Sequence, residues 1–131
     1  MQNCKILVKG IIKCDNQYLV VAKWYDDCIM DPYQWQFIDG EADFGEAPDA
    51  AVIRHIQEQV GLTADITKIL YTWSFMQGDT QKVGIAYECI VSNDQIILSE
   101  ELNDAKWITK EEVFDYIKNE SVIQDLQKIE L

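Results

Sequence analysis

Residues 40–62, which read GEADFGEAPDAAVIRHIQEQVGL, constrain the fold more than any other segment of this chain. The stretch from Ala47 to Val60 is predicted to be a helix, because Pro48 suits a first helical turn and Gly61 favours a stop. At about 100° per residue, one side of this helix carries aliphatic residues: Val52, Ile53, Ile56 and Val60. The other side carries small or charged residues: Ala47, Ala51, Arg54 and Glu58. The segment therefore predicts a helix that packs one face into a core.

Four polar residues of this helix are spaced so that they can face a common site. Arg54 and Glu58 lie four residues apart, and His55 and Gln59 form a parallel row beside them. The plain alternative is a solvated ion pair between Arg54 and Glu58 on an amphipathic helix. Helical spacing alone does not distinguish a common site from a solvated ion pair. The residues outside the helix must decide between them.

Runs rich in β-branched and aromatic residues predict strands on both sides of the helix. They cover residues 5–13, 18–24, 34–38, 66–76, 83–91 and 105–108. The Asp15-Asn16 pair favours a tight turn and an antiparallel hairpin, and the third strand is expected to lead into a loop with Gly40. Helices are also predicted at 111–118 and 122–129. This order predicts an α/β fold with a mixed sheet packed between helices, in a single domain over residues 1–131.

The composition narrows the classes of partner. The net charge is -12, from 23 acidic residues against 11 Lys and Arg, so binding of a nucleic-acid backbone is not expected. We expect any phosphate ligand to arrive with divalent cations. The N-terminal residues lack an apolar signal core, and no stretch approaches the roughly 18 apolar residues of a membrane helix. A cytoplasmic protein without membrane partners is expected.

The cysteines argue against a zinc site. Cys4, Cys14, Cys28 and Cys89 are scattered singly, without a C-x-x-C pair, and His55 is the only histidine in the sequence. Cysteine often packs as a small hydrophobic residue, so buried reduced thiols are the expected state.

Residues 40–62 resemble the signature of the Nudix hydrolase family. That signature runs glycine, five residues, glutamate, seven residues, then Arg-Glu-aliphatic-x-Glu-Glu-x-Gly-aliphatic. The matching positions are Gly40, Glu46, Arg54, Ile56, Glu58, Gly61 and Leu62. The sequence departs from it at His55 and Gln59, where the family has glutamates, and at Ile38-Asp39, which replaces a usual Pro-Gly. Trp35-x-Phe37 and residues 104–112 extend the resemblance over nearly the whole chain.

The resemblance implies a Nudix-type α/β/α sandwich and hydrolysis of the diphosphate bond in a nucleoside diphosphate derivative. In the family, this signature is called the Nudix box. Its glutamates hold Mg²⁺ or Mn²⁺ against the diphosphate, and one of them activates water. Glu58 is thereby implied as a catalytic residue and metal ligand, and Gly40 as part of the metal site. Glu46 and Arg54 are implied to orient the loop and the neighbouring carboxylates.

The two substituted positions change the expected chemistry. His55 is a poor Mg²⁺ ligand and a fair one for Mn²⁺ or other transition metals; it is alternatively a general base, or a surface histidine without chemistry. Gln59 offers a carbonyl oxygen without charge, which weakens cation binding. Glu101 and Gln59 are candidate supplementary ligands. Other acids near the site are Asp39, Glu41, Asp43, Glu100 and Asp104.

Two functions remain open, and we place hydrolysis first. The first is a metal-dependent Nudix hydrolase acting on a small nucleotide diphosphate. The second is a catalytically impaired Nudix domain that binds a nucleotide or a protein partner; a purely structural role ranks third. Aromatic residues able to stack on a base lie in the segment from Trp24 to Trp35 and at Trp73 and Tyr87, although core packing explains them equally well. The oligomeric state, monomer or homodimer, stays open.

Overall fold

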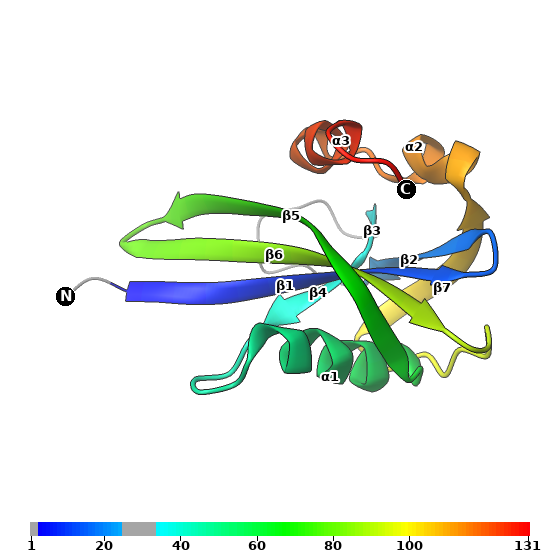
Figure 1. Ribbon diagram of the computed structural model, residues 1–131, viewed down its shortest axis with the longest axis horizontal. Helices are drawn as coiled ribbons and strands as arrows, with labels where there is room; N and C mark the ends of the chain where they lie inside the picture. The colour runs from blue at the N-terminus through cyan, green and yellow to red at the C-terminus, as the bar shows by residue number, and fades with distance from the viewer. Residues whose placement is uncertain (1–2, 25–33) are drawn as a thin grey trace.

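The structure is a computed structural model that describes residues 3–24 and 34–131. Its centre is a seven-stranded sheet of β1 (Asn3–Cys14), β2 (Gln17–Lys23), β3 (Trp35–Gln36), β4 (Ile38–Glu41), β5 (Ala64–Gln77), β6 (Thr80–Val91) and β7 (Leu102–Thr109). Helix α1 (Pro48–Val60) covers one face, and α2 (Val113–Tyr116) and α3 (Glu120–Gln127) lie over the other (Figure 1). The predicted α/β arrangement, a mixed sheet between helical layers, is confirmed.

The strand order explains why the sheet is mixed. The order is β3-β2-β1-β6-β5, with β4 paired to β1 and β7 paired to β2. β1 and β6 run parallel, whereas the other pairs are antiparallel. The predicted hairpin of β1 and β2 is present, and β5 and β6 form a second one. Asp15 has a φ of 55° in the first turn, a conformation that aspartate tolerates, and Gly78 has a φ of 60° in the second.

The segment before the helix differs from the prediction. The expected strand at 34–38 is two strands, β3 and β4, and β4 continues through Gly40 to Glu41 instead of ending in a turn at Ile38-Asp39. It does so because its four residues pair with β1, from Gly10 opposite Ile38 to Leu7 opposite Glu41. Strand alternation then assigns Ile38 and Gly40 to the α1 face of the sheet and Asp39 and Glu41 to the opposite face.

Helix α1 buries most of the face that the aliphatic pattern predicts, because Val52, Ile56 and Val60 are fully buried, but the buried face is shifted to one side. Ala51 is fully buried and Gln59 is 3% exposed, although both were expected on the polar side; Ile53 is only half-buried. The helix approaches β1 closely at Gly10. A Cβ atom there would lie 3.0 Å from Ile56 Cδ1, a tight contact that glycine avoids.

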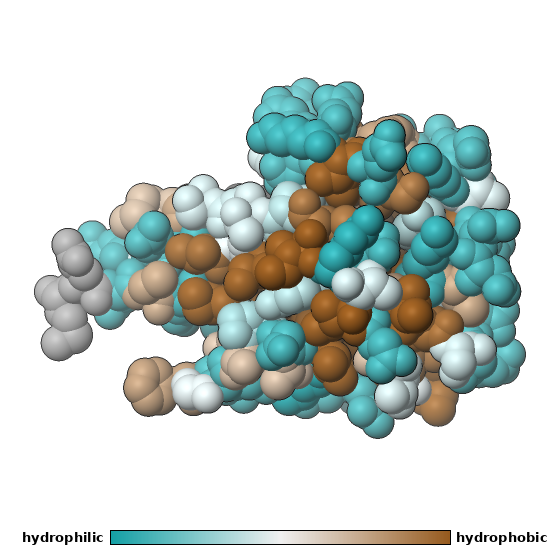
Figure 2. All heavy atoms as spheres, viewed as in Figure 1, coloured by the Kyte–Doolittle hydropathy of each residue, from teal (hydrophilic) through white to brown (hydrophobic). Residues whose placement is uncertain are grey.

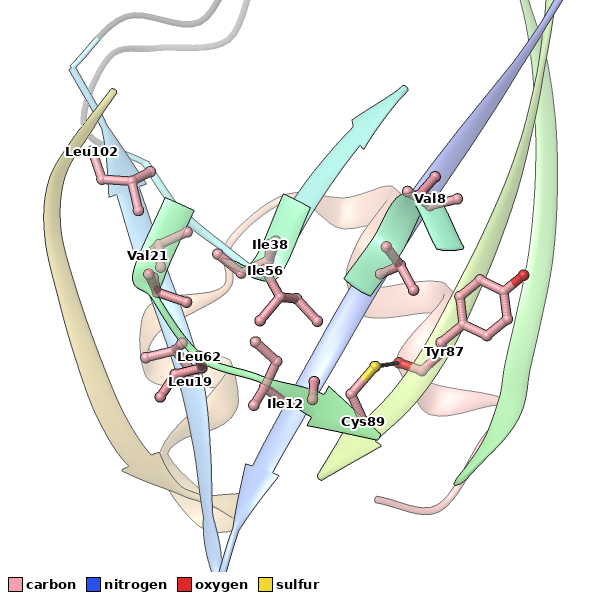
Figure 3. Close-up of a cluster of buried hydrophobic side chains, with 14 residues drawn as sticks. Val8, Ile12, Leu19, Val21, Ile38, Ile56, Leu62, Tyr87, Cys89 and Leu102 are labelled. Atoms are coloured by element: carbon pink, nitrogen blue, oxygen red, sulfur yellow. Dashed lines mark hydrogen bonds between the residues drawn. The ribbon is translucent and has the colours of Figure 1, made fainter. Parts of the chain in front are cut away.

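Two hydrophobic clusters occupy the two faces of the sheet. The first packs α1 against the sheet and includes Val8, Ile12, Leu19, Val21, Ile38, Val52, Ile56, Val60, Tyr87 and Cys89 (Figure 3). The second lies under α2 and α3 and includes Ile11, Tyr18, Val20, Phe37, Ile108, Val113, Ile117 and Leu126. Figure 2 shows apolar side chains also gathered at the surface between the helical layers. The chain therefore builds two cores that share one sheet.

The predictions for the cysteines and for the two late helices have different outcomes. Cys89 is buried as expected, but Cys4 is exposed near the start of β1, so the prediction of buried thiols is wrong for it; Cys28 lies outside the described residues. The late helical segments begin at Lys110 and Glu120. Thr109 and Glu112 form the capping box that starts the first of them.

We expect Ile56→Ala to destabilise the protein by about 2–5 kcal/mol, because Ile56 is fully buried between α1 and β1 and its truncation leaves a cavity. Urea denaturation measures the change. Gln57→Ala, at the neighbouring exposed position of the same helix, is the control and should change stability by less than about 0.5 kcal/mol. Equal effects of the two substitutions would contradict the packing described here.

Candidate functional site

The two substituted box positions hold α1 against β4 through backbone carbonyls. The Gln59 Nε2 amide donates to the carbonyl oxygen of Asp39 at 2.9 Å. The His55 Nε2 atom lies 2.7 Å from the carbonyl oxygen of Glu41. Because a carbonyl only accepts, this contact assigns the hydrogen to Nε2 of the imidazole. Both side chains therefore act as hydrogen-bond donors to the strand.

Gly40 lies between these two contacts and faces the imidazole. A Cβ atom at position 40 would overlap the ring atoms of His55. Position 40 is in extended strand conformation, so the need for glycine here comes from space and not from a positive φ. Gly40 and His55 are thus sterically coupled.

Arg54, on the charged face of α1, contacts several acidic side chains. Its Nε and Nη2 atoms each lie 2.9 Å from Glu46 carboxylate oxygens, a bidentate pair, and its Nη1 atom lies 3.3 Å from Glu58. It also donates to the Glu41 carbonyl at 3.3 Å and lies 3.6 Å from Asp43 Oδ2. The Glu46 carboxylate accepts the backbone N–H of Asp43 at 3.0 Å, which closes the loop before the helix. Arg54 therefore links this loop to α1.

This pairing sets the protonation of both groups. The hydrogen bonds from Arg54, and then the one from the Asp43 backbone, lower the pKa of Glu46 from its ordinary 4.5 to about 2. The Glu46 carboxylate in turn raises the pKa of Arg54. Both members of the pair are charged throughout the neutral range.

Glu58 and Gln59, although adjacent, lie in different environments. The Glu58 side chain is 56% exposed and is ion-paired with Arg54. Gln59 is buried, and its Oε1 atom has no hydrogen-bond partner among the described residues. The Glu58 carboxylate is therefore exposed to solvent, whereas the side chain of Gln59 is buried against β4.

The candidate supplementary acids are largely committed to other contacts. Asp39 binds Lys23 at 2.7 Å, and Glu41 binds Lys82 at 3.2 Å. Glu101 is exposed in the turn before β7 and, within the described part of the chain, forms no hydrogen bond or ion pair with α1. The structure thus places Glu101 apart from the contacts that surround Arg54.

A cavity of about 310 Å³ opens on the other side of β4. Its charged and aromatic lining consists of Lys9, Lys23, Lys82, Asp39, Glu41, Trp35, Phe37, Trp73 and Phe75. Trp73 was among the aromatic residues expected near a ligand. Tyr87 was as well, but it is buried in the core under α1. Of the expected segment from Trp24 to Trp35, residues 25–33 lie outside the described residues. The lysines were not foreseen, because they are scattered over three strands.

The comparisons with known proteins identify the family. The family model of the NUDIX domain matches residues 7–126. The chain therefore belongs to the Nudix hydrolase family. A relative named nucleoside triphosphatase NudI, from Escherichia coli O139:H28 (strain E24377A / ETEC), is 26% identical over 126 residues, covering 88% of this chain and 89% of that protein.

Solved structures show the same fold. The MutT protein of Methanosarcina mazei Go1 superposes with a TM-score of 0.79 at 17% identity, covering 97% of this chain and 93% of that one. An Ap4A hydrolase of C. elegans superposes with a TM-score of 0.74 at 20% identity, covering 95% and 96%. The predicted Nudix fold is therefore confirmed. In the described residues, no helix has both the length and the apolar character needed to cross a membrane.

The family typically uses a divalent metal, and the donors present can be tested against that need. Mg²⁺ requires about six oxygen ligands in octahedral geometry. The two matched box carboxylates, Glu46 and Glu58, both pair with Arg54. His55 and Gln59 use N–H groups to bind carbonyls. The Gln59 Oε1 atom is a neutral oxygen, and in residues 3–24 and 34–131 no three His, Cys, Asp or Glu side chains are grouped to hold a metal. These donors do not fit a Mg²⁺ site.

The Arg54–Glu46 pair makes stability depend on pH in the acid range. Because the folded state lowers the pKa of Glu46 to about 2, the pair stabilises the fold above the ordinary value of 4.5, and this contribution is lost as the pH falls toward 2. We expect Glu46→Gln to lower the melting temperature at pH 7. The difference from the native protein should shrink between pH 4.5 and pH 2, and Asp49→Asn, at an exposed first-turn acid, is the control. A difference that is constant with pH would contradict the pairing.

The contact between Gly40 and His55 predicts strong coupling between substitutions. Gly40→Ala displaces the imidazole from the strand and should cost about 1–3 kcal/mol by overpacking. In a His55→Ala background the space is free, so the same change should cost less by at least about 1 kcal/mol. A double-mutant cycle in urea measures the coupling. Additive effects would show that the ring does not lie against residue 40.

Proposed function

We propose that this chain binds a nucleoside diphosphate compound in the cavity beside β4, as a Nudix domain whose hydrolase chemistry is impaired. The observation that carries this proposal is the hydrogen bonding of the two substituted box positions. His55 and Gln59 donate to β4 carbonyls at 2.7 and 2.9 Å. Ionised glutamates at these positions accept hydrogen bonds and do not donate them, so they would leave the same carbonyls available to other partners. At the two positions where the family has glutamates, His55 and Gln59 therefore attach α1 to β4.

The cavity supports a nucleotide as the ligand. Trp35 and Phe75 offer rings on which a base can stack, and the lysines offer donors for phosphate oxygens. The relatives named nucleoside triphosphatase and Ap4A hydrolase act on ligands of this class by their names. The net charge of -12 disfavours a nucleic-acid strand, so the proposed partner is a small molecule.

Hydrolysis of the diphosphate bond with Mg²⁺ or Mn²⁺ is a second candidate function, because Glu58 is retained. Its carboxylate is more than half exposed on the face that carries Arg54. Glu58 and His55 are the residues proposed to act on the substrate in this case, with Gly40 beside them in β4. Arg54 and Glu46 are proposed to orient the loop and the Glu58 carboxylate.

Restoring the two acids distinguishes the candidates. We expect the native chain to release little phosphate from nucleoside diphosphate compounds in Mg²⁺ or Mn²⁺. His55→Glu/Gln59→Glu should raise the rate by at least about a hundredfold, the usual scale of positioned acid–base and metal assistance. Phosphate release and thermal shift are measured on the same samples, so that folding of the variant is established independently.

The control variant for this assay is Glu58→Gln. It should abolish the activity gained by the restored variant and leave ligand binding by the native chain unchanged. Rapid turnover by the native chain that disappears in Glu58→Gln would instead establish hydrolysis as its function. Absence of any nucleotide-dependent thermal shift in the native chain would refute the binding proposal.

A further inference from the structure

The cavity beside β4 is electropositive in a strongly acidic protein. Three of the 11 basic residues of the chain, Lys9, Lys23 and Lys82, line it, against two acids, Asp39 and Glu41. The lysines come from β1, β2 and β6, and the pairing of these strands brings them to one place. On a molecule of net charge -12, such a cluster favours one class of ligand, an anion.

Lys9 is the most informative member of this cluster, because it is only 9% exposed. Its Nζ atom donates to the Tyr71 hydroxyl at 3.2 Å and lies 4.7 Å from the centre of the Trp73 ring. Trp73 is held there because it lies across Gly84, where a Cβ atom would overlap the indole. Within the described residues, no carboxylate forms an ion pair with Lys9. The ammonium group is therefore buried among neutral donors, acceptors and rings.

A buried ammonium group without a carboxylate is costly, and an anionic ligand removes that cost. Burial lowers the pKa of Lys9, while the more distant charges of Asp39 and Asp125 oppose that shift. The aromatic face of Trp73 stabilises the cation in part. The Tyr71 hydroxyl and the Trp73 ring together do not replace a negative charge. An anionic ligand that pairs with the Lys9 ammonium group would supply that charge.

Lys23 and Lys82 complete the site in a different way. They are ion-paired with Asp39 and Glu41, the two β4 side chains that point away from α1. The acids are 36% and 45% exposed, whereas the side chains of Lys23 and Lys82 are only 23% and 12% exposed. An anion that takes over the lysines would therefore leave the carboxylates within reach of water. A phosphate entering the cavity would replace the carboxylates as partner of each lysine.

We propose that Lys9, Lys23 and Lys82 neutralise the diphosphate of the bound nucleotide directly, so that this chain binds its ligand without a divalent cation. This inference rests on the proposed nucleotide-binding function. It replaces the expectation, based on net charge, that a phosphate ligand arrives with its metal. Lysine ammonium groups bind phosphates as point charges, and here they would supply the positive charge that cations supply in the family.

Calorimetry in the presence of EDTA tests the proposal. The probes are ADP, GDP, CDP and UDP, with inorganic pyrophosphate as the anion common to all and the matching nucleosides as uncharged controls. We expect at least one nucleoside diphosphate to bind equally well in EDTA and in Mg²⁺, and pyrophosphate to compete with it. Lys9→Met should weaken binding by roughly ten- to a hundredfold, the scale of a lost hydrogen bond to a charged group.

Two further variants keep the test decisive. Lys82→Gln, at the edge of the cavity, should weaken binding in the same direction if Lys9→Met fails to fold. Lys68→Gln is the matched control, because Lys68 is exposed on β5 and does not line the cavity. Melting temperatures of all variants establish that they are folded.

The outcomes separate this inference from the function on which it rests. Binding that requires Mg²⁺ or Mn²⁺, or that survives both lysine substitutions, overturns the lysine site and leaves nucleotide binding in place. Nucleosides that bind as tightly as their diphosphates also overturn it, because the lysines would then not hold the anion. No binding of any nucleotide, with or without metal, overturns the proposed function itself.

Discussion

The structure depends on the hydrogen bonds that α1 makes to the carbonyls of β4. Gln59 and His55 bind the backbone of Asp39 and Glu41 from one side of the sheet. The side chains of the same two strand residues bind Lys23 and Lys82 on the other side. The four residues of β4 thereby join α1 to the cavity. Burial of the polar Gln59 side chain is tolerated because its amide finds this carbonyl, although its own oxygen stays unpaired among the described residues.

The charges differ on the two sides of β4. On the α1 side, the box has two carboxylates fewer than the family pattern, and Glu46 and Glu58 are bound to Arg54. The cavity across the strand is lined by three lysines and two acids, Asp39 and Glu41. In the family, cations link acidic protein groups to an acidic ligand; here lysines supply positive charge at the cavity. This distribution of charge is the physical basis of the binding function that we propose.

Much of the fold was predictable from the sequence because the box spacing is specific and the strands are rich in β-branched residues. The helix and the hairpin at Asp15-Asn16 lie where local patterns placed them. The extension of β4 to Glu41 was missed, because two of its four residues, Asp39 and Gly40, have low strand propensity and pair only through β1. The burial of Gln59 was missed because it depends on a hydrogen bond to β4, a tertiary contact that helical periodicity does not contain. The lysine cluster has no local pattern at all, since its members are brought together by long-range pairing.

The parallel pairing of β1 with β6 has a consequence for folding. β1 pairs with β6 through residues that are distant in the sequence, from Asn3 opposite Thr80 to Lys13 opposite Ile90. Helix α1 and β5 lie between the two strands along the chain. Such non-local pairing closes slowly, because the entropy of a long intervening loop is lost before the contacts form. Lys9 lies on β1 and Lys82 on β6, so the cavity is complete only when these two strands have paired. A fragment that ends before β6 would retain the whole box and two of the three lysines, Lys9 and Lys23, but would lack Lys82.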